Sequence, residues 1–540
     1  MRFRWLAALA VALVSTGLAN AQPKPLEPTI EVRLRSVNDL VDKFEYVAAL
    51  AGKEDAAAQV REFLKALSAD KKGIEGIDPK QPFGAYALLE KEVANSPFVV
   101  MVPVADEEQF LKALEKHLGV TVEKGDEGTK KVPVPLAGEA HLRFANGYVY
   151  VSQKVKDLDA KALVKPAAYF ANDDGAVASL VVHVDRIPAD LRAFAFGQFE
   201  LGVNQERKKN EENESPAEKK LKGLVFDAIL AGTKGTLDDG KDLSIKLFAD
   251  PKSDDLNAEV TFSAKSGTTT ARNFSAMGSK TSLPAGIVAT ANPAAKGNLK
   301  LAMTDGIKKE FSAAVDELFA EALKKAPDDQ QAVLKSLIAA VSPTIKSGEL
   351  DVAASLVGPN AKGHVQLITA LAAKDGKEFE KFVKKFVGDY GDLIGAFVEI
   401  KLDVEKIGAF NLHRIELQQA DDNFEKIFGT KVFWLATSDT ALAISIEPEG
   451  ELIKKGLKAQ PVPVAVASVD AAVAKLAPLA QPDAKPDELK ALLKDAFGGS
   501  PAGKDTVTFG IEGGEQLKVK FKLKGKAVRF GAGLDALKGK

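Results

Sequence analysis

The pattern of apolar and polar residues along the chain predicts short strands that alternate with pairs of helices. Residues 30–35 alternate between apolar and charged side chains, which is typical of a strand with one buried face. Apolar residues then recur every three to four positions, which predicts a helix that ends at Gly52. A second helix is expected over residues 54–67, and the two strands after it are expected to pair as a hairpin.

The same order of elements recurs three more times along the chain. Further strands are predicted at residues 180–185, 298–303 and 462–466, each followed by a helical stretch and two more strands. After the strand at 462–466, Asp470 is expected to open the helix. Short paired strands with helices in blocks favour antiparallel sheets over a doubly wound parallel sheet. The predicted fold class is therefore α+β, with repeated strand-helix-helix-hairpin units. We place unit one at 22–170, unit two at 171–295, unit three at 296–458 and unit four at 459–540.

The spacing of these elements also predicts an internal duplication. Asp106 follows a strand and opens a helix, with Phe110 four residues further on, and Asp375 and Phe379 repeat this arrangement in the second half of the chain. The offset between these two motifs nearly equals the offset between the first strands of units one and three. The first strands of units two and four are separated by a similar length of chain. Similar offsets are expected when a chain contains two homologous halves, each a long unit followed by a shorter one.

The N-terminal segment, residues 1–21, predicts a cleavable signal peptide. Two arginines precede an uncharged apolar run from Trp5 to Val14, and Ala19-Asn20-Ala21 is the small-x-small pattern at which signal peptidase cleaves. The run is shorter than the ~20 residues that a transmembrane helix needs. We therefore expect an exported chain, periplasmic or extracellular, that is soluble after cleavage near Ala21 and has no transmembrane segment.

Composition excludes several classes of protein. The chain has no Cys, which excludes disulfides, a lipid anchor on Cys, thiol nucleophiles and Cys metal sites. The 73 Lys and Arg nearly balance the 75 Asp and Glu, which argues against nucleic acid as a partner. Of the 540 residues 46% are hydrophobic, which is enough for several cores.

No motif in the sequence identifies a catalytic, cofactor or metal site, and we assign none. Residues 235–242 match the phosphate-binding pattern G-x-x-x-x-G-K, but Asp242 replaces the Ser or Thr that follows it, and Asp-Asp-Gly favours a hairpin turn. The five His lack metal-ligand spacing, so a residue such as His183 is expected to be a packed or edge residue of a strand. A site formed by two carboxylates from distant segments of the chain stays an open alternative.

The last predicted strand, residues 516–523, has the one pattern with functional interest. Lys alternates with apolar residues over 517–524, so that four ammonium groups share one face. A solvated face that prevents edge-to-edge association explains this pattern, and a stripe that contacts polyanions such as envelope phosphates is the alternative. The residues of this candidate polyanion-contacting stripe are Lys518, Lys520, Lys522 and Lys524.

Two segments, Gly76–Leu89 and Ser96–Leu114, resemble an uncharacterised family of exported proteins of planctomycete-type bacteria. The resemblance covers part of the first quarter of the chain, and it implies export without a known activity. We expect an exported, non-enzymatic binding or structural envelope protein of unknown ligand. Two alternatives stay open: a hydrolase whose carboxylates are assembled across units, and a carrier of lipid or another apolar ligand.

Overall fold

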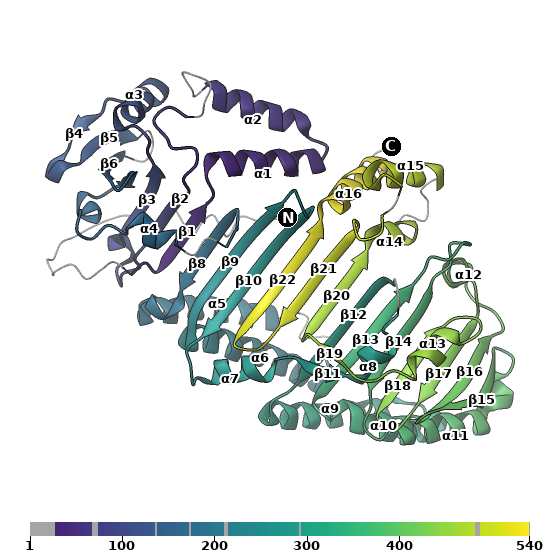
Figure 1. The fold of residues 1–540 in the computed structure, drawn as a ribbon. Helices are drawn as coiled ribbons and strands as arrows, with labels where there is room; N and C mark the ends of the chain where they lie inside the picture. Colours follow the sequence, from purple (N-terminus) through teal and green to yellow (C-terminus); the bar gives the residue numbers. More distant parts are fainter. Residues whose placement is uncertain are drawn as a thin grey trace. The chain divides into compact units, whose positions relative to one another are not determined.

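The computed structural model describes residues 27–66, 74–134, 138–171, 174–209, 214–290, 293–480, 486–499 and 501–538. The predicted signal peptide lies outside these residues. The chain forms two compact bodies, which Figure 1 shows in colours that follow the sequence. The N-terminal body comprises the described residues within 1–197, 236–270 and 524–532, and the C-terminal body comprises those within 198–235, 271–523 and 533–540. Both bodies combine helices with antiparallel sheet, which confirms the predicted α+β class.

In the N-terminal body, the described strands form an antiparallel sheet in the spatial order β4-β5-β6-β7-β3-β2-β1-β8-β9-β10. The first strands along the chain are β1 (Ile30–Leu34), β2 (Phe83–Ala87), β3 (Phe98–Pro103), β4 (Glu123–Lys124) and β5 (Lys130–Val134). They are followed by β6 (Gly138–Ala145), β7 (Tyr148–Ser152), β8 (Ala178–His183), β9 (Gly240–Asp250) and β10 (Asp255–Ala264).

Helices join the strands of this sheet in blocks, as the sequence pattern predicts. The segment between β1 and β2 contains α1 (Val37–Leu50) and α2 (Glu54–Ala66), and α3 (Glu107–Leu118) follows β3. The short α4 (Pro166–Tyr169) precedes β8, α5 (Ala189–Arg207) and α6 (Pro216–Asp239) connect β8 to β9, and α7 (Thr269–Ala276) follows β10. Asp106 caps α3, because its side chain accepts a hydrogen bond from the Gln109 N–H.

The main core of the N-terminal body lies on β2, β3 and β7. It is rich in tyrosine, and it contains Tyr86, Val99, Met101, Tyr148, Tyr150, Leu158, Leu163 and Tyr169. Burial raises the pKa of Tyr148 to about 12, so its hydroxyl stays protonated. The neighbouring strands β1, β8 and β9 instead carry charged residues on the same face of the sheet.

In the C-terminal body, the described strands of the main antiparallel sheet lie in the order β15-β16-β17-β18-β14-β13-β12-β20-β21-β22. Their bounds are β12 (Pro293–Ala302), β13 (Glu349–Val357), β14 (Gln366–Ala372), β15 (Val398–Ile407), β16 (Phe410–Leu417), β17 (Val432–Thr437), β18 (Ala441–Ile446), β20 (Ala467–Ala472), β21 (Thr506–Glu512) and β22 (Gln516–Lys524). A separate two-stranded ribbon joins β11 (Lys280–Ser282) to β19 (Val462–Val464).

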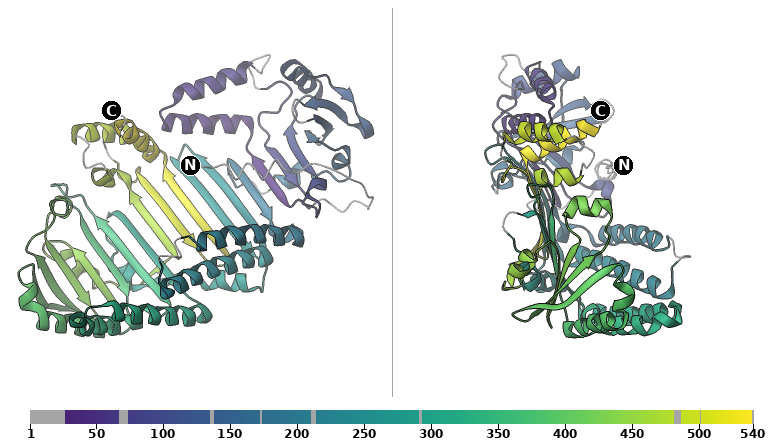
Figure 2. Two further views of the ribbon diagram at one scale, coloured as in Figure 1. Left: turned by 180° about the vertical axis from the view of Figure 1, so that it is seen from behind. Right: turned by 90° about the vertical axis from the view of Figure 1, so that its right-hand side faces the viewer.

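Long helices connect the strands of the C-terminal body. The pair α9 (Asp305–Lys325) and α10 (Asp328–Ile345) lies between β12 and β13, and α11 (Gly376–Ile394) lies between β14 and β15. Figure 2 shows these three helices beside one end of the strands, so that they leave much of one sheet face uncovered. The remaining helices are α8 (Leu283–Ile287), α12 (Asp422–Phe428), α13 (Glu451–Gly456), α14 (Val473–Ala480), α15 (Pro486–Phe497) and the last element, α16 (Gly525–Lys538).

Two local predictions are wrong. Asp470 was expected to open a helix, but it lies inside β20, where it pairs with Lys296 of the adjacent strand. Residues Asp238-Asp239-Gly240 were expected to form a hairpin turn, but α6 continues to Asp239 and β9 begins at Gly240. Within the described residues, no helix has the length and the hydropathy that a membrane span requires.

Candidate functional site

A polar pocket of about 1230 Å³ lies on one face of the sheet of the N-terminal body. Alternate residues of β1, β8 and β9 form its base, because successive side chains of a strand point to opposite faces. These residues are Glu31 and Arg33 of β1, Ser179, Val181 and His183 of β8, and Asp242, Ser244 and Lys246 of β9. Pro166 and Ala167 of α4 and the following Phe170 also line the pocket.

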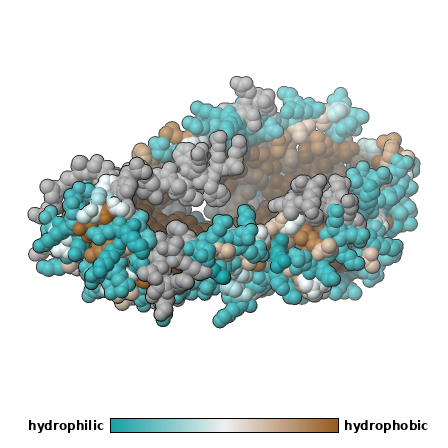
Figure 3. Space-filling view, turned by 90° about the horizontal axis from the view of Figure 1, so that it is seen from above, coloured by the Kyte–Doolittle hydropathy of each residue, from teal (hydrophilic) through white to brown (hydrophobic). Residues whose placement is uncertain are grey.

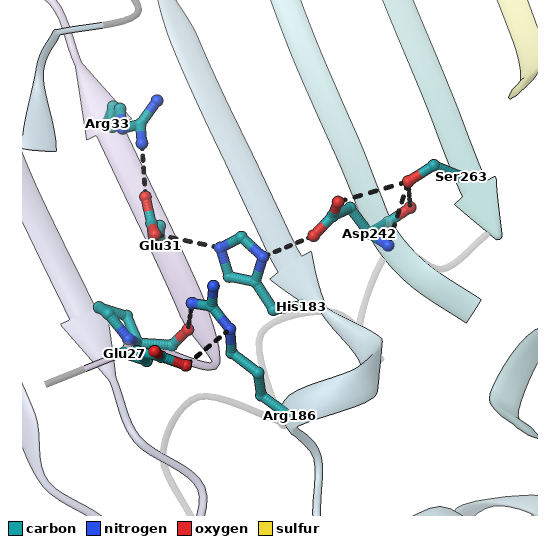
Figure 4. Close-up of polar contacts among 8 residues, drawn as sticks. Glu27, Glu31, Arg33, His183, Arg186, Asp242 and Ser263 are labelled. Atoms are coloured by element: carbon teal, nitrogen blue, oxygen red, sulfur yellow. Dashed lines mark hydrogen bonds and ion pairs between the residues drawn. The ribbon is translucent and has the colours of Figure 1, made fainter. Parts of the chain in front are cut away.

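His183 lies at the centre of a hydrogen-bonded network at one end of this pocket. Its Nδ1 lies 2.6 Å from the Asp242 carboxylate and its Nε2 lies 3.1 Å from the Glu31 carboxylate. The two carboxylates lie on opposite sides of the imidazole ring (Figure 4). Glu31 also accepts a hydrogen bond from Arg33, and Ser263 contacts the far side of Asp242. The network therefore joins four neighbouring strands.

The environment of His183 favours its charged form. The hydrogen bond to Glu31 raises the pKa of His183, and although burial opposes this change, the second bond to Asp242 supports it. Burial alone would raise the pKa of Glu31, but hydrogen bonds and charge interactions with His183 and Arg33 outweigh that effect and lower it. Both ring nitrogens face carboxylate oxygens, which accept hydrogen bonds, so the geometry and the raised pKa of His183 both favour the imidazolium.

These pKa changes predict a pH dependence of stability. Since the pKa of His183 is raised in the folded state, its contribution is complete below the ordinary value of 6.5 and is lost as the pH rises through the folded-state pKa. The lowered pKa of Glu31 gives a contribution that is present above 4.5 and is lost as the pH falls. We expect the melting temperature of the wild-type protein to fall from pH 6 to pH 9 by more than that of His183→Gln. Equal slopes in a pH series of thermal melts would contradict this expectation.

The geometry of this network does not match that of a hydrolase. A general base needs a free ring nitrogen near the substrate, but carboxylates occupy both nitrogens of His183. Ser263 contacts Asp242 rather than His183, so the order of a Ser-His-Asp triad is absent. The imidazole ring also fills the space between Glu31 and Asp242, where a glycosidase would hold the bond to be cleaved. The arrangement is suited to binding a polar ligand.

Three cationic side chains lie away from His183 in the pocket. Arg33, Arg35 and Lys246 line it, and Lys246 forms an ion pair with Asp174. The Arg35 Nε donates to the Ala176 carbonyl oxygen at 3.2 Å. The Arg33 guanidinium lies over the Tyr169 ring, 5.0 Å from its centroid, and the buried Arg33 Nε has no hydrogen-bond partner. The pocket therefore has charges of both signs, and Glu31 is paired with Arg33, as Asp174 is with Lys246.

A second cluster, in the C-terminal body, brings together Glu380, Asp403 and His413 at distances that a metal ion could bridge. The Lys384 ammonium already contacts both carboxylates, at 2.5 Å from Glu380 and 2.9 Å from Asp403. The Nδ1 of His413 accepts a hydrogen bond from the Asp403 N–H, so its lone pair is occupied. An internal cation thus fills this cluster, and the residues do not fit a metal ion.

The C-terminal body has a different candidate surface, an exposed apolar face on its sheet. Large apolar side chains lie on the same face of seven neighbouring strands, each 37–49% exposed. In register, Leu301 lies opposite Leu350, and Phe509 lies opposite both Val469 and Phe521. We define this apolar face by Phe521, Phe509, Val469, Leu301, Leu350, Leu371 and Ile444, in the order of their strands from β22 to β18.

The opposite face of the central strands is covered and forms a core. Ala353, Ile368, Ala370 and Ala443 are buried there in the same cluster as Ile287 of α8 and Ile453 of α13. These strands are therefore apolar on both faces, although helices α8 and α13 cover only one. In the space-filling view, hydrophobic surface lines a hollow on the right, the side where β12 to β18 lie in Figure 1 (Figure 3).

The four lysines of the predicted stripe all lie on β22, and Lys524 is its last residue. Lys520 forms an ion pair with Glu512 of β21, and Lys518 lies opposite Glu512 in the strand register. Lys524 forms an ion pair with Asp255. At least two of the four ammonium groups are therefore already compensated by carboxylates, which weakens the case for a polyanion site.

Sequence reasoning missed the polar pocket. His183 was expected to be an ordinary strand residue, and nothing in its local sequence indicates two carboxylate partners. One signal was present, because Glu31, Arg33 and Arg35 alternate along a strand and so must share a face. Which strands lie beside that face depends on pairings between residues that are distant in the sequence.

Comparisons with protein families, with curated proteins and with solved structures find no match to this chain.

Proposed function

We propose that the chain is a non-enzymatic binding protein whose C-terminal body carries an apolar ligand with flexible acyl chains. The observation that supports this proposal is the apolar face, a row of half-exposed apolar side chains on seven adjacent strands. Soluble proteins rarely expose a continuous apolar patch of this kind unless it binds a ligand or a partner. The carrier thus becomes the favoured alternative among those that the sequence left open.

The energy available from this face is substantial. Fully burying a Val, Leu, Ile or Phe side chain contributes about 1.5–3 kcal/mol, so completing the burial of seven half-exposed side chains contributes roughly 5–10 kcal/mol. Part of that energy offsets the loss of motion on binding. The acyl chain of the ligand leaves water at the same time and contributes about 0.8 kcal/mol per CH₂ group, which brings a micromolar complex, about 8 kcal/mol, within reach.

The shape of the surface favours a flexible ligand over a protein partner. The apolar surface is hollowed, neither flat nor protruding (Figure 3). Ile307 of α9, the helix after β12, and Ile345 of α10, the helix before β13, are each more than one-third exposed. An acyl chain can follow such a hollow and contact both the sheet and the helices, whereas the flat face of a folded partner would contact only its rim.

Binding of a fluorescent fatty acid tests the proposal. We expect the purified protein to bind it with micromolar affinity, and the substitution Phe521→Glu to weaken binding at least about tenfold, because a carboxylate would enter the apolar face. Phe98→Glu is the matched control, because Phe98 is similarly exposed but lies in the N-terminal body. Equal losses in both variants, or no binding by the wild type, would contradict the proposal.

We also propose that the two bodies arose by internal duplication. The proposal is supported by strand order, since β7-β3-β2-β1-β8-β9-β10 has the same sequence of connections as β18-β14-β13-β12-β20-β21-β22. Helices interrupt both series at corresponding places, with α1–α2 matching α9–α10 and α3 matching α11. Sequence profiles of the two halves should align over these strands, and profiles no more alike than those of unrelated chains would contradict the duplication.

Export and envelope residence stay proposals that rest on the sequence alone. The signal-peptide pattern at residues 1–21 supports export, as does the resemblance to exported proteins of planctomycete-type bacteria. The mass of the protein recovered outside the cytoplasm is expected to correspond to a chain that begins at Gln22. Recovery of the full-length chain from the cytoplasm alone would contradict export.

A further inference from the structure

We propose that the polar pocket of the N-terminal body is a second, separate binding site, which takes a short neutral oligosaccharide. The proposal does not depend on the apolar face, because every residue of the pocket belongs to the N-terminal body. It rests on the balance of charge in the pocket, on two serine hydroxyls that are available to a ligand, and on apolar side chains among the polar ones.

The charges that line the pocket balance one another. Five carboxylates accompany four Lys or Arg side chains and the His183 imidazolium. The carboxylates are those of Glu31, Asp39, Asp78, Asp174 and Asp242, and the other cations are Arg33, Arg35, Lys80 and Lys246. Glu31 is ion-paired with Arg33, and Asp174 is paired with Lys246. A charged ligand would lose its hydration here without gaining an unpaired counter-charge, so the pocket favours a ligand without net charge.

Two serine hydroxyls on the base of the pocket are available to a ligand. Ser179 of β8 and Ser244 of β9 are both partly exposed, and neither hydroxyl forms a hydrogen bond with another residue that the structure describes. Lys246 lies opposite Ser179 in the strand register, and its ammonium group has donors beyond the one that Asp174 accepts. A hydroxyl both donates and accepts, so a sugar hydroxyl can pair with either serine and with the neighbouring charged groups.

Apolar side chains lie among these polar groups. Val181 is in the middle of the base and lies opposite Ser244 in the strand register. Phe170 bounds the base at β2, where its ring is in contact with Gly84. This ring is partly exposed, and it stacks on Tyr148 with 5.9 Å between the ring centroids. A sugar ring has hydroxyls around its edge and C–H groups on its faces, so it matches a lining of both kinds, and its C–H groups can pack on an aromatic face.

The cavity is large enough for more than one sugar ring. Its volume of about 1230 Å³ exceeds the ~300–1,000 Å³ that is usual for small-ligand pockets. From Glu31 to Arg35 the base extends about 13 Å along the chain direction of β1. A single ring would leave part of this base in contact with water, whereas a short oligosaccharide can lie along it. A polyanion fits less well, because each of its charges would need an unpaired cation.

Calorimetric titration of the full-length protein with trisaccharides tests the proposal. The neutral probes are maltotriose, cellotriose, xylotriose and triacetylchitotriose, and the charged probes are the cationic glucosamine trimer and the anionic galacturonate trimer. We expect at least one neutral probe to bind at millimolar concentration or below, and both charged probes to bind at least about threefold more weakly than it does. Raising the salt concentration tenfold is expected to change the Kd of the neutral probe by less than about twofold, since it carries no charge that salt could screen.

Two substitutions test the serine contacts. Ser179→Ala and Ser244→Ala each remove a hydroxyl without breaking a hydrogen bond to any described residue. We expect each to weaken binding of the neutral probe about threefold or more, and the double variant about tenfold or more. Ser266→Ala is the matched control, because Ser266 is an exposed residue of the same body outside the pocket.

A third substitution tests the balance of charge by a gain of binding, which a damaged fold would not give. Asp174→Asn leaves the Lys246 ammonium without its carboxylate, so we expect the galacturonate trimer to bind about threefold more tightly than it binds to the wild type. The proposal is overturned if no neutral probe binds at millimolar concentration, if a charged probe binds the wild type more tightly, if the double serine variant binds like the wild type, or if Asp174→Asn gives no gain.

Discussion

Substitution of His183 by Leu is expected to lower the free energy of unfolding of the N-terminal body by about 3 kcal/mol. The imidazolium is the shared partner of Glu31 and Asp242, and its side chain is only 16% exposed. Without it, the carboxylates of Glu31 and Asp242, on the two strands that flank β8, would repel each other, and the Asp242 carboxylate would keep the Ser263 hydroxyl as its partner. For a body of this size, the loss corresponds to a melting temperature lower by roughly 6–12 °C.

Circular dichroism at pH 6 measures this effect, with His117→Leu as the control, because His117 is an exposed residue of α3. The triple variant Glu31→Gln, His183→Leu, Asp242→Asn distinguishes uncompensated charge from lost packing as the cause of the destabilisation. If uncompensated charge causes the loss, the triple variant is expected to be more stable than the single variant. A triple variant that is as unstable as His183→Leu would show that packing, and not charge, is responsible.

Substitution of Trp434 by Ala is expected to destabilise the C-terminal body by about 3–5 kcal/mol, the usual cost of removing a buried aromatic ring. Trp434 is 5% exposed and belongs to the core beneath the sheet. Its Nε1 donates to the Glu447 carbonyl oxygen at 3.1 Å, and its ring lies against Gly450 and Lys454. The loss therefore includes a cavity and an unpaired carbonyl group.

Urea titration followed by circular dichroism measures this loss, because the substitution removes the indole whose fluorescence would otherwise report unfolding. Trp434→Phe keeps most of the ring and loses the hydrogen bond, so we expect it to cost less than half as much. A similar cost in both variants would mean that the bond to Glu447, rather than the filled volume, holds α13 against the sheet. A cost below about 1 kcal/mol for Trp434→Ala would contradict the packing argument.

Local pattern predicted most of the elements of this chain, because alternation and helical spacing are properties of neighbouring residues. The strand expected at 30–35 is β1, the helix expected at 54–67 is α2, and the strands expected at the end of the chain are β21 and β22. The error at Asp470 has a physical reason. An acidic residue after an apolar run is typical of a helix start, but Lys296 on the adjacent strand compensates it within the sheet.

The candidate sites could be predicted only in part, since both depend on which strands are neighbours. The alternation of Glu31, Arg33 and Arg35 indicated a polar face, but the contacts with His183 and Asp242 arise from pairings between strands that are far apart in the sequence. The apolar face could not be predicted either, because in the sequence the apolar residues of each strand have the pattern of ordinary core residues. Only the arrangement of the helices beside the sheet leaves them exposed.

The discontinuity of the N-terminal body has a consequence for the order in which the chain can fold during synthesis. Its residues 524–532 are made after the whole sheet of the C-terminal body. They supply the Lys524 ion pair with Asp255, and the backbone N–H groups of Gly525 and Lys526, which donate to Asp254. A nascent chain that has not reached Lys524 therefore leaves Asp254 and Asp255 without these partners. The N-terminal body is completed last, although its first strand is made first.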